Sequence, residues 1–379
     1  MTTDKLPQEQ IDHILNLFKS DQIQQALDFI DTLSKDYPDE SLLFNIRGAC
    51  YAGLGQLDIA VQSYEKALSI KPDYAKAHYN LGGALQELDK LHDSAKSYEN
   101  AIALEPENAQ AHNNLAIVLR ELDQLEEAEA SCRKAIVLDP EYAEAHSCLS
   151  IILYANGDLN SALESIKKAY SINPKLKIIK LLLAVLKARK THKTSKVSIS
   201  NIRSISNPLI LNRAVEQELI ANLYEMKSLE LEKTKDPSYG NARGSGYQLF
   251  QDDHSSIIKT VEEDLVRIVI EAIKADIHVK DSFFTILGAG GGVNRHNHIS
   301  ALDIDSSLNL INQKFSLVYY LSVGDQDCTE PGILKLYDPS ENILPREGMI
   351  IIFPADRHHS VVYNGKKDRI IIGINFYSL

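Results

Sequence analysis

The sequence contains no tryptophan, three methionines and four cysteines, and its cysteines form no C-x-x-C pair. Such scattered cysteines argue against a disulfide framework or a zinc knuckle, and they favour a reducing compartment. Long apolar runs are also missing, because the longest helical one, Leu181 to Leu186, is far below the roughly 20 residues of a membrane span. The N-terminus, MTTDKLPQEQ, lacks the apolar stretch of a signal peptide. We therefore expect a soluble, cytoplasmic protein that does not associate with membranes.

Basic residues are too few for a nucleic-acid-binding protein. The chain has 40 Lys and Arg against 52 Asp and Glu, a formal net charge of −12, whereas such proteins need basic surface to neutralise phosphates. The exception is the segment from Lys175 to Lys196, which has eight basic residues and no acid. The sequence also has no glycine-rich phosphate loop and no βαβ alternation, which argues against a Rossmann or P-loop nucleotide enzyme. At 379 residues, the chain is long enough for two domains.

The first half of the chain repeats with a period of 34 residues, marked by Pro38, Pro72, Pro106, Pro140 and Pro174. One column of small residues keeps the same spacing at Ala26, Ala60, Ser94, Ala128 and Ala162. A second, mostly small column lies at Ile14, Gly48, Gly82, Ala116 and Ser150. Small residues let the two antiparallel helices of a unit approach closely, and a proline after the second helix sets the turn. Five positions in phase indicate a helical repeat array.

This pattern resembles the tetratricopeptide repeat, and the resemblance covers roughly Pro7 to Pro174. It implies five repeats over residues 1–174 and a basic capping helix or linker over residues 175–195, since such arrays need a terminal cap. The basic side of that helix is either a solvated face or a site for an acidic partner.

The resemblance also implies that a protein or peptide binds in the groove of the array. Regularly spaced polar side chains, similar to the asparagine ladder of the O-GlcNAc transferase superhelix, are candidates to bind the peptide backbone: Asn45, Tyr79, Asn80, Asn113 and Asn114. The alternative is that these side chains only cap or solvate the first helix of each repeat.

After about Ser195 the period stops, and a β domain is expected over residues 196–379. An amphipathic helix is predicted near Ser255 to Ala275, with a stripe of apolar residues. From Asp281 onward, β-branched and aromatic runs such as KFSLVYYLSV and GMIIIFPA are separated by Gly, Pro, Asn and Asp. This spacing is typical of an antiparallel sandwich or barrel. The expected fold class is therefore a multidomain α + β chain, with an α-solenoid before the β domain.

Two histidine motifs and an arginine in the β domain point to metal chemistry. RHNHISALD places His296 and His298 two residues apart after a glycine-rich turn. Residues i and i+2 of a strand face the same way, so both imidazoles could bind one metal ion while Asn297 points outward. FPADRHHS contains His358 and His359 at the entrance to a later strand, with His359 as the candidate ligand and His358 as the alternative, and Arg369 follows ten residues after His359.

This order of motifs resembles the prolyl-hydroxylase-like oxygenases that use Fe(II) and 2-oxoglutarate, over about Phe283 to Phe376. The resemblance implies a double-stranded β-helix, or jelly roll, with flanking helices. It also implies that His296, His298 and His359 bind Fe(II), and that O2 and 2-oxoglutarate are co-substrates.

By the same resemblance, Arg369 binds the far carboxylate of 2-oxoglutarate with the help of Tyr320. A planar guanidinium can bond both carboxylate oxygens at once. The departure from the family is His298, where the usual triad has a carboxylate. A subgroup of short oxygenase-like proteins with an H-x-H motif is closer to this chain in that respect. Three neutral ligands would leave the ferrous site one charge more positive than the usual triad does, and Asp303 or Asp305 could supply the carboxylate instead.

The sequence thus predicts a hydroxylase whose repeat array recruits a protein or peptide. Asparaginyl/aspartyl β-hydroxylase relatives join the same two domain types. One rival is a cupin-like enzyme with a three-histidine metal site and no 2-oxoglutarate, since Gly290 to His298 fits the start of the cupin motif. The other is a non-enzymatic repeat scaffold whose barrel has lost its function.

Overall fold

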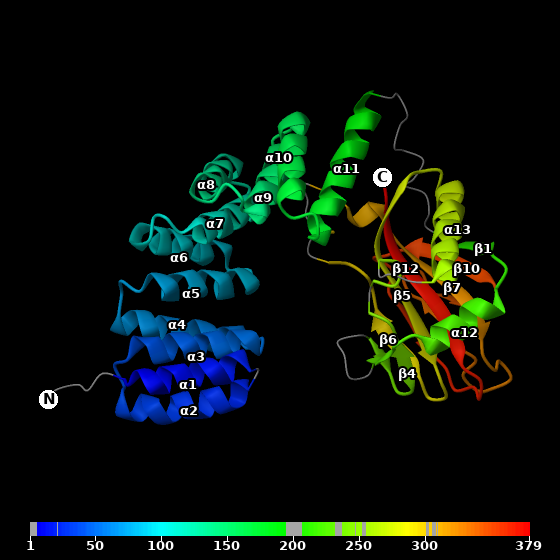
Figure 1. The fold of residues 1–379 in the computed structure, drawn as a ribbon, viewed down its shortest axis with the longest axis horizontal. Helices are drawn as coiled ribbons and strands as arrows, with labels where there is room; N and C mark the ends of the chain where they lie inside the picture. The colour runs from blue at the N-terminus through cyan, green and yellow to red at the C-terminus, as the bar shows by residue number, and fades with distance from the viewer. Residues whose placement is uncertain are drawn as a thin grey trace. The chain divides into compact units, whose positions relative to one another are not determined.

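The computed structural model describes residues 6–20, 22–194, 207–231, 237–246, 248–251, 255–300, 303–304, 308 and 310–379. The chain divides into two compact units, Met1–Ile179 and Lys180–Leu379 (Figure 1). The division falls inside α11 (Lys177–Thr194), so the helix that the sequence marks as a cap is shared between the two units. None of the described helices is both long and apolar enough to cross a membrane.

Antiparallel helix pairs build the first unit. The helices of its described part are α1 (Gln8–Lys19), α2 (Ile23–Asp36), α3 (Ser41–Gly53), α4 (Leu57–Ile70), α5 (Ala75–Glu87), α6 (Leu91–Leu104), α7 (Ala109–Glu121), α8 (Leu125–Leu138), α9 (Ala143–Ala155) and α10 (Leu159–Ile172). Each second helix of a pair ends two residues before one of the five periodic prolines. The repeat period of the sequence is therefore the period of the helix pairs.

The small-residue columns lie where paired helices touch. Every member of the first column is fully buried, at 0% exposure: Ala26, Ala60, Ser94, Ala128 and Ala162. In the second column, a Cβ atom added to Gly82 would lie 3.0 Å from the ring of Tyr98, and one added to Gly48 would lie 2.5 Å from the ring of Tyr64. Glycine at these positions lets a buried tyrosine pack directly on the neighbouring helix backbone.

A repeated histidine contact, which the sequence analysis did not predict, links each turn to the helix that follows it. The Nε2 atoms lie 2.9–3.0 Å from carbonyl oxygens in the preceding turn, in the pairs His78 with Pro72, His112 with Pro106, and His146 with Pro140. The signal was present, because these histidines share the 34-residue spacing of the prolines.

The second unit contains two antiparallel sheets. The seven-stranded sheet has the order β1 (Leu209–Asn212), β10 (Met349–Pro354), β7 (Lys314–Val323), β12 (Arg369–Ser378), β5 (Ile277–Leu287), β4 (Ala242–Gly244) and β2 (Leu229–Glu230). The five-stranded sheet has the order β3 (Ser238–Tyr239), β6 (Gly292–His296), β11 (His359–Val362), β8 (Leu334–Leu336) and β9 (Glu341–Ile343). A short 3-10 helix, η3 (Ile311–Gln313), leads into β7.

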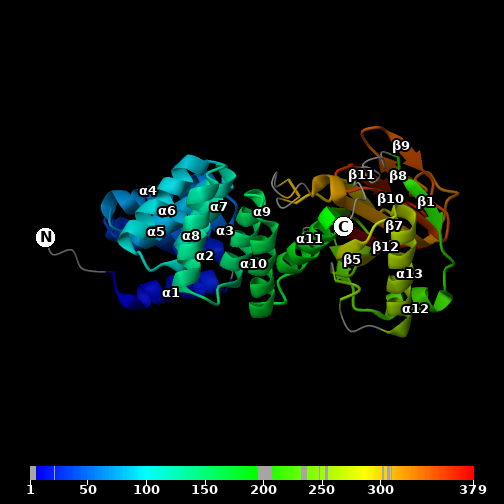
Figure 2. The same ribbon diagram turned by 90° about the horizontal axis from the view of Figure 1, so that it is seen from above.

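Two helices cover one face of the seven-stranded sheet, and the five-stranded sheet lies on the other side (Figure 2). The helices are α12 (Gln217–Glu225) and α13 (Ser256–Ile273). The second of these is the predicted amphipathic helix, and its buried stripe packs on alternate residues of the central strands, such as Ile372 of β12. Because side chains alternate along a strand, the other residues of these strands face the five-stranded sheet.

Candidate metal centre

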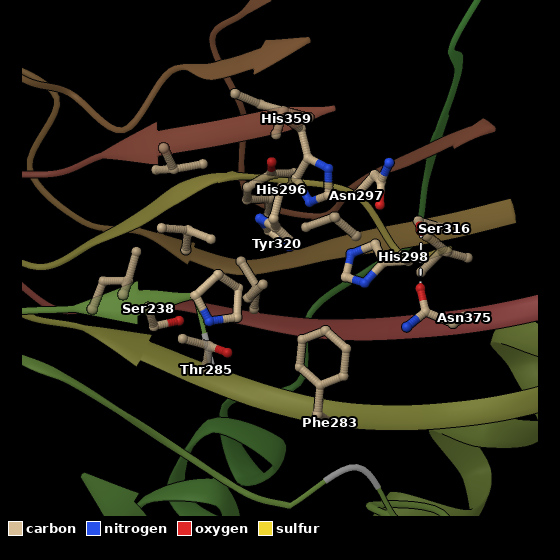
Figure 3. A pocket seen from close by; sticks show the side chains of 18 of the residues that line it. Ser238, Phe283, Thr285, His296, Asn297, His298, Ser316, Tyr320, His359 and Asn375 are labelled. Carbon is tan, nitrogen blue, oxygen red and sulfur yellow. Dashed lines mark hydrogen bonds between the residues drawn. The ribbon is translucent and has the colours of Figure 1, made fainter. Parts of the chain in front are cut away.

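Three histidines come together between the two sheets (Figure 3). His296, at the end of β6, is the cross-strand partner of His359, at the start of β11. His298 follows two residues after β6 ends, and its backbone N–H donates to the carbonyl of Ala355 at 2.9 Å. One ligand nitrogen from each ring lies within 4.8 Å of the others, and the ring centroids are 4.2–5.0 Å apart. This spacing suits three imidazoles around one cation.

Two of the three histidines are kept neutral. Burial, and after it the neighbouring His296, lowers the pKa of His359 to about 3. Burial and the two other imidazoles also lower the pKa of His298 well below its ordinary value. A neutral imidazole has a free lone pair, which is the form that binds a metal ion.

Backbone carbonyls orient two of the rings. Nδ1 of His296 lies 2.8 Å from the carbonyl of Asn294, and Nδ1 of His359 lies 3.4 Å from the carbonyl of Arg357. A proton on Nδ1 that donates to such a carbonyl leaves Nε2 as the lone-pair nitrogen. The side chains are therefore held in a tautomer that can bind a cation.

A cavity of about 180 Å³ connects the histidines with the predicted co-substrate residues. It is lined at alternate positions of the central strands, by Phe283, Thr285 and Leu287 of β5, Ser316, Val318 and Tyr320 of β7, and Arg369, Ile371 and Asn375 of β12. The structure thus brings together His296, His298, His359, Tyr320 and Arg369, all of which were predicted from motifs.

Arg369 is a buried cation, and two of its three guanidinium nitrogens have no polar partner in the described part of the chain. Its side chain is 2% exposed, and its Nε and Nη1 atoms have no hydrogen-bond acceptor there. The guanidinium lies 5.1 Å from the ring centroid of Tyr320, whose buried hydroxyl likewise has no partner. Burial lowers the pKa of Arg369, and the neighbouring tyrosine opposes that shift. A buried charge of this kind is costly unless an anion bonds to it.

Asp303, one of the two acids suggested as a third ligand, is bonded to other residues. Asp303 is fully buried at 0% exposure, and its Oδ2 atom lies 2.7 Å from Nζ of Lys314. The same oxygen accepts bonds from Ser300, and Oδ1 accepts a 2.6 Å bond from the hydroxyl of Tyr377. Asp305 lies outside the described residues. Of the alternatives that the sequence leaves open, His298 is the one that lies beside the other two histidines.

One orientation expected from strand alternation is wrong. Asn297 does not point outward but lines the cavity beside His296 and His298 (Figure 3). The reason is that β6 ends at His296, so the alternation of a strand does not extend to the next residues. The two histidines converge because of cross-strand pairing and the turn that follows, not because they share one strand face.

The predicted peptide-binding residues form bonds between neighbouring repeats. Nδ2 of Asn80 donates to Oδ1 of Asn45 at 3.0 Å, and Nδ2 of Asn114 donates to the hydroxyl of Tyr79 at 3.1 Å. Asn45 and Asn113 are buried, and the other three are half-buried. Oδ1 of Asn113 has no partner among the described residues. The same pattern would pair it with residue 148, but Cys148 carries no amide donor.

Comparisons with known proteins concern the repeat unit. Family models of the tetratricopeptide repeat match residues 48–89 and 79–143, so this part of the chain consists of tetratricopeptide repeats. The peroxisomal targeting signal receptors of Candida glabrata and Saccharomyces cerevisiae are 31% and 30% identical to it over 67 residues. The match covers 18% of this chain and spans only 11% of the length of those curated relatives.

Two solved structures are also similar to the repeat unit. One is YrrB, described as a TPR protein with an unusual peptide-binding site, at 22% identity and a TM-score of 0.42, over 50% of this chain and 93% of that chain. The other is PilW, a type IV pilus biogenesis factor, at 23% identity and a TM-score of 0.44, over 52% of this chain and 96% of that chain.

Proposed function

We propose that the second unit is a double-stranded β-helix oxygenase that uses Fe(II), 2-oxoglutarate and O2, and that the repeat unit recruits its protein or peptide substrate. The observation that carries the first part is Arg369. Its guanidinium is buried, two of its nitrogens lack an acceptor in the described structure, and it lines the same cavity as three converging histidines. Such a group favours an anionic ligand. 2-Oxoglutarate has a carboxylate to bond the arginine and a second carboxylate with a keto group to reach a metal ion.

The residues present fit this pair of ligands. The three imidazoles would hold the metal ion through one face, and Arg369 with the hydroxyl of Tyr320 would bond the distal carboxylate. Iron with its co-substrate supplies the oxidising power when bound. The protein's own part is to orient the ligands, to keep the imidazoles unprotonated and to exclude water with apolar walls such as Phe283, Val318 and Ile371.

The repeat unit supports a peptide or protein as the substrate class. Tetratricopeptide repeats match its sequence, and the curated relatives that it resembles are receptors for a targeting signal. We assign the contact with the partner to the half-buried polar side chains of the predicted ladder, Tyr79, Asn80 and Asn114.

A second candidate is a three-histidine metalloenzyme of the cupin type that does not use 2-oxoglutarate. It is favoured by the ligand set, because three neutral imidazoles leave a divalent ion more positive than the usual two histidines and a carboxylate do. Asp303, which the sequence suggested as a carboxylate ligand, is bonded to Lys314 instead. The role of Arg369 separates the candidates, since an enzyme without 2-oxoglutarate has no need of it.

The test is an anaerobic titration of Fe(II) and then 2-oxoglutarate into the metal-free full-length protein, followed by visible absorption. We expect a weak metal-to-ligand charge-transfer band that is lost in Arg369→Ala and kept in Arg213→Ala. The latter is a matched control, because Arg213 is buried on the helical side with its own acid partners, Glu216 and Asp264. Iron binding without a band would favour the three-histidine enzyme. No iron binding would leave a repeat scaffold with a non-catalytic β domain.

A further inference from the structure

A buried ion pair lies directly behind the third histidine. Lys314, the first residue of β7, is 1% exposed, and Asp303 is 0% exposed. Their Nζ and Oδ2 atoms are 2.7 Å apart. Neither residue lines the cavity, so neither is placed to touch a substrate. An ion pair this deeply buried gives little net stability compared with apolar residues, because both ions lose their hydration. Its presence therefore calls for another role.

Lys314 also bonds the backbone of His298. Its Nζ atom donates to the carbonyl oxygen of His298. The N–H of His298 donates to the carbonyl of Ala355, whose own N–H donates to the carbonyl of Lys314 at 3.0 Å. Both polar groups of the His298 backbone are thus held by β7 or by the residue that follows β10. This matters because β6 has already ended at His296, so no sheet ladder fixes the position of His298.

Asp303 in turn fixes the ammonium group that holds His298. It accepts bonds from the N–H and the hydroxyl of Ser300, both at 2.6 Å, and from the hydroxyl of Tyr377 of β12 at 2.6 Å. The bonds from Lys314, Ser300 and Tyr377 hold the pKa of Asp303 below its ordinary value, although burial alone would raise it. The carboxylate is therefore a charged anchor that connects the turn after β6 with two central strands.

We propose that the Lys314–Asp303 pair is a positioning device that fixes His298 as the third ligand of the metal centre. This inference rests on the proposed function, since it assumes that the three histidines bind a metal ion. In this proposal Asp303 is not itself a metal ligand. It holds the lysine that positions the ligand His298. Outer residues that orient metal ligands change metal affinity by roughly 10- to 100-fold when they are replaced.

The test compares Lys314→Met/Asp303→Asn with the wild type and with Arg213→Met, in the full-length metal-free protein titrated with Co(II). The double variant fills the space of the lysine stem and leaves no unpaired buried charge. The asparagine oxygen can accept from Ser300, and its amide N–H can donate to the hydroxyl of Tyr377. Arg213→Met removes a buried ion-pair network on the helical face of the same unit. We expect the double variant to bind Co(II) roughly 10- to 100-fold more weakly and with an altered visible spectrum. Arg213→Met should lose thermal stability but keep the affinity and spectrum of the wild type.

The outcomes separate the inference from the proposed function. A His298→Ala variant, measured in parallel, reports whether His298 belongs to the Co(II) site at all. If the wild type shows a spectrum that depends on His298 and the double variant reproduces its affinity and spectrum, the positioning role is wrong while the metal centre stands. If the wild type binds no Co(II), the metal centre fails and the positioning role fails with it.

Discussion

Replacing Arg369 by methionine should stabilise the metal-free protein, although arginine is the residue on which the proposed function depends. Two of its nitrogens are buried and lack an acceptor in the described structure, and an unmade hydrogen bond of a buried polar group costs about 1–3 kcal/mol. The variant also loses the contact between the guanidinium and the ring of Tyr320 at 5.1 Å, which is worth about 0.5–2 kcal/mol. Taken as one such group, the guanidinium costs about 2 kcal/mol at the middle of its range, against about 1 kcal/mol for the lost ring contact, so Arg369→Met should gain roughly 1 kcal/mol.

Hydrogen exchange of the β12 amides is the assay for this change. β12 lies between β7 and β5 in the middle of the seven-stranded sheet, so its slowest amides report the opening of the second unit by itself. The matched control is Arg213→Met, where the same replacement breaks the ion pairs of a buried guanidinium with Glu216 and Asp264 and should lower the opening free energy. Two buried arginines should thus respond with opposite signs.

Saturating 2-oxoglutarate with a divalent metal should reverse the order of wild type and Arg369→Met. A ligand at about 100 times its Kd raises stability by about 2.7 kcal/mol, and only the wild type retains the group that bonds the distal carboxylate. A lower opening free energy for metal-free Arg369→Met than for the wild type would refute the reasoning. It would mean that the guanidinium already has a stabilising partner inside the protein.

Three further predictions concern packing, pH and the array. Gly82→Leu should destabilise the repeat unit by about 1–3 kcal/mol, since a Cβ there already lies 3.0 Å from the ring of Tyr98, whereas Gly53→Ala meets open space and should be neutral in urea unfolding. Metal-free protein should lose thermal stability as pH falls from about 6.5 toward 3. In that range the imidazole of His359 is protonated in the unfolded chain but stays neutral in the folded protein, because folding lowers its pKa. His359→Gln should make the stability depend less steeply on pH, and an unchanged dependence would contradict the assignment. Asn114→Ala should cost about 0.5–1.5 kcal/mol in the array, because it removes an inter-repeat bond, and calorimetry that shows no loss would mean that the bond is unimportant.

The repeat unit could be predicted from the sequence because its rules are local. A small residue every 34 positions is needed wherever two helices touch, and even the exception follows the rule: Ser94 is fully buried and its hydroxyl donates to the carbonyl of Gly82 at 2.7 Å. What the period could not reveal is how the polar ladder is used. The same asparagines suit a peptide or each other, and only the distance between neighbouring helices decides that Asn80 bonds Asn45.

The members of the histidine cluster could be predicted from the sequence, and the residues that hold them in place could not. Short motifs, recognisable from their order along the sequence, contain all four residues: His296, His298, His359 and Arg369. The partner of Asp303 could not be found that way, because its contacts with Lys314 and Tyr377 join distant segments through a turn without periodicity. The sequence held one indication of this contact. The mostly apolar strand KFSLVYYLSV begins with a lysine, and a lysine that is buried needs an acid as its partner.

The charge balance of the cavity leads to a last prediction. Three neutral imidazoles add no negative charge to a divalent ion, the carboxylate of Asp303 is bonded to Lys314, and Arg369 contributes a further buried positive charge. On the proposed function, 2-oxoglutarate would then neutralise both the metal and the arginine, so each ligand should strengthen the binding of the other. Coupling between two sites is reciprocal and typically amounts to about 1–3 kcal/mol. Titrations in both orders should therefore give the same factor, roughly 5- to 150-fold, and Arg369→Ala should weaken the binding of 2-oxoglutarate without abolishing that of the metal. Equal iron affinity with and without 2-oxoglutarate would contradict the shared neutralisation and favour the three-histidine enzyme.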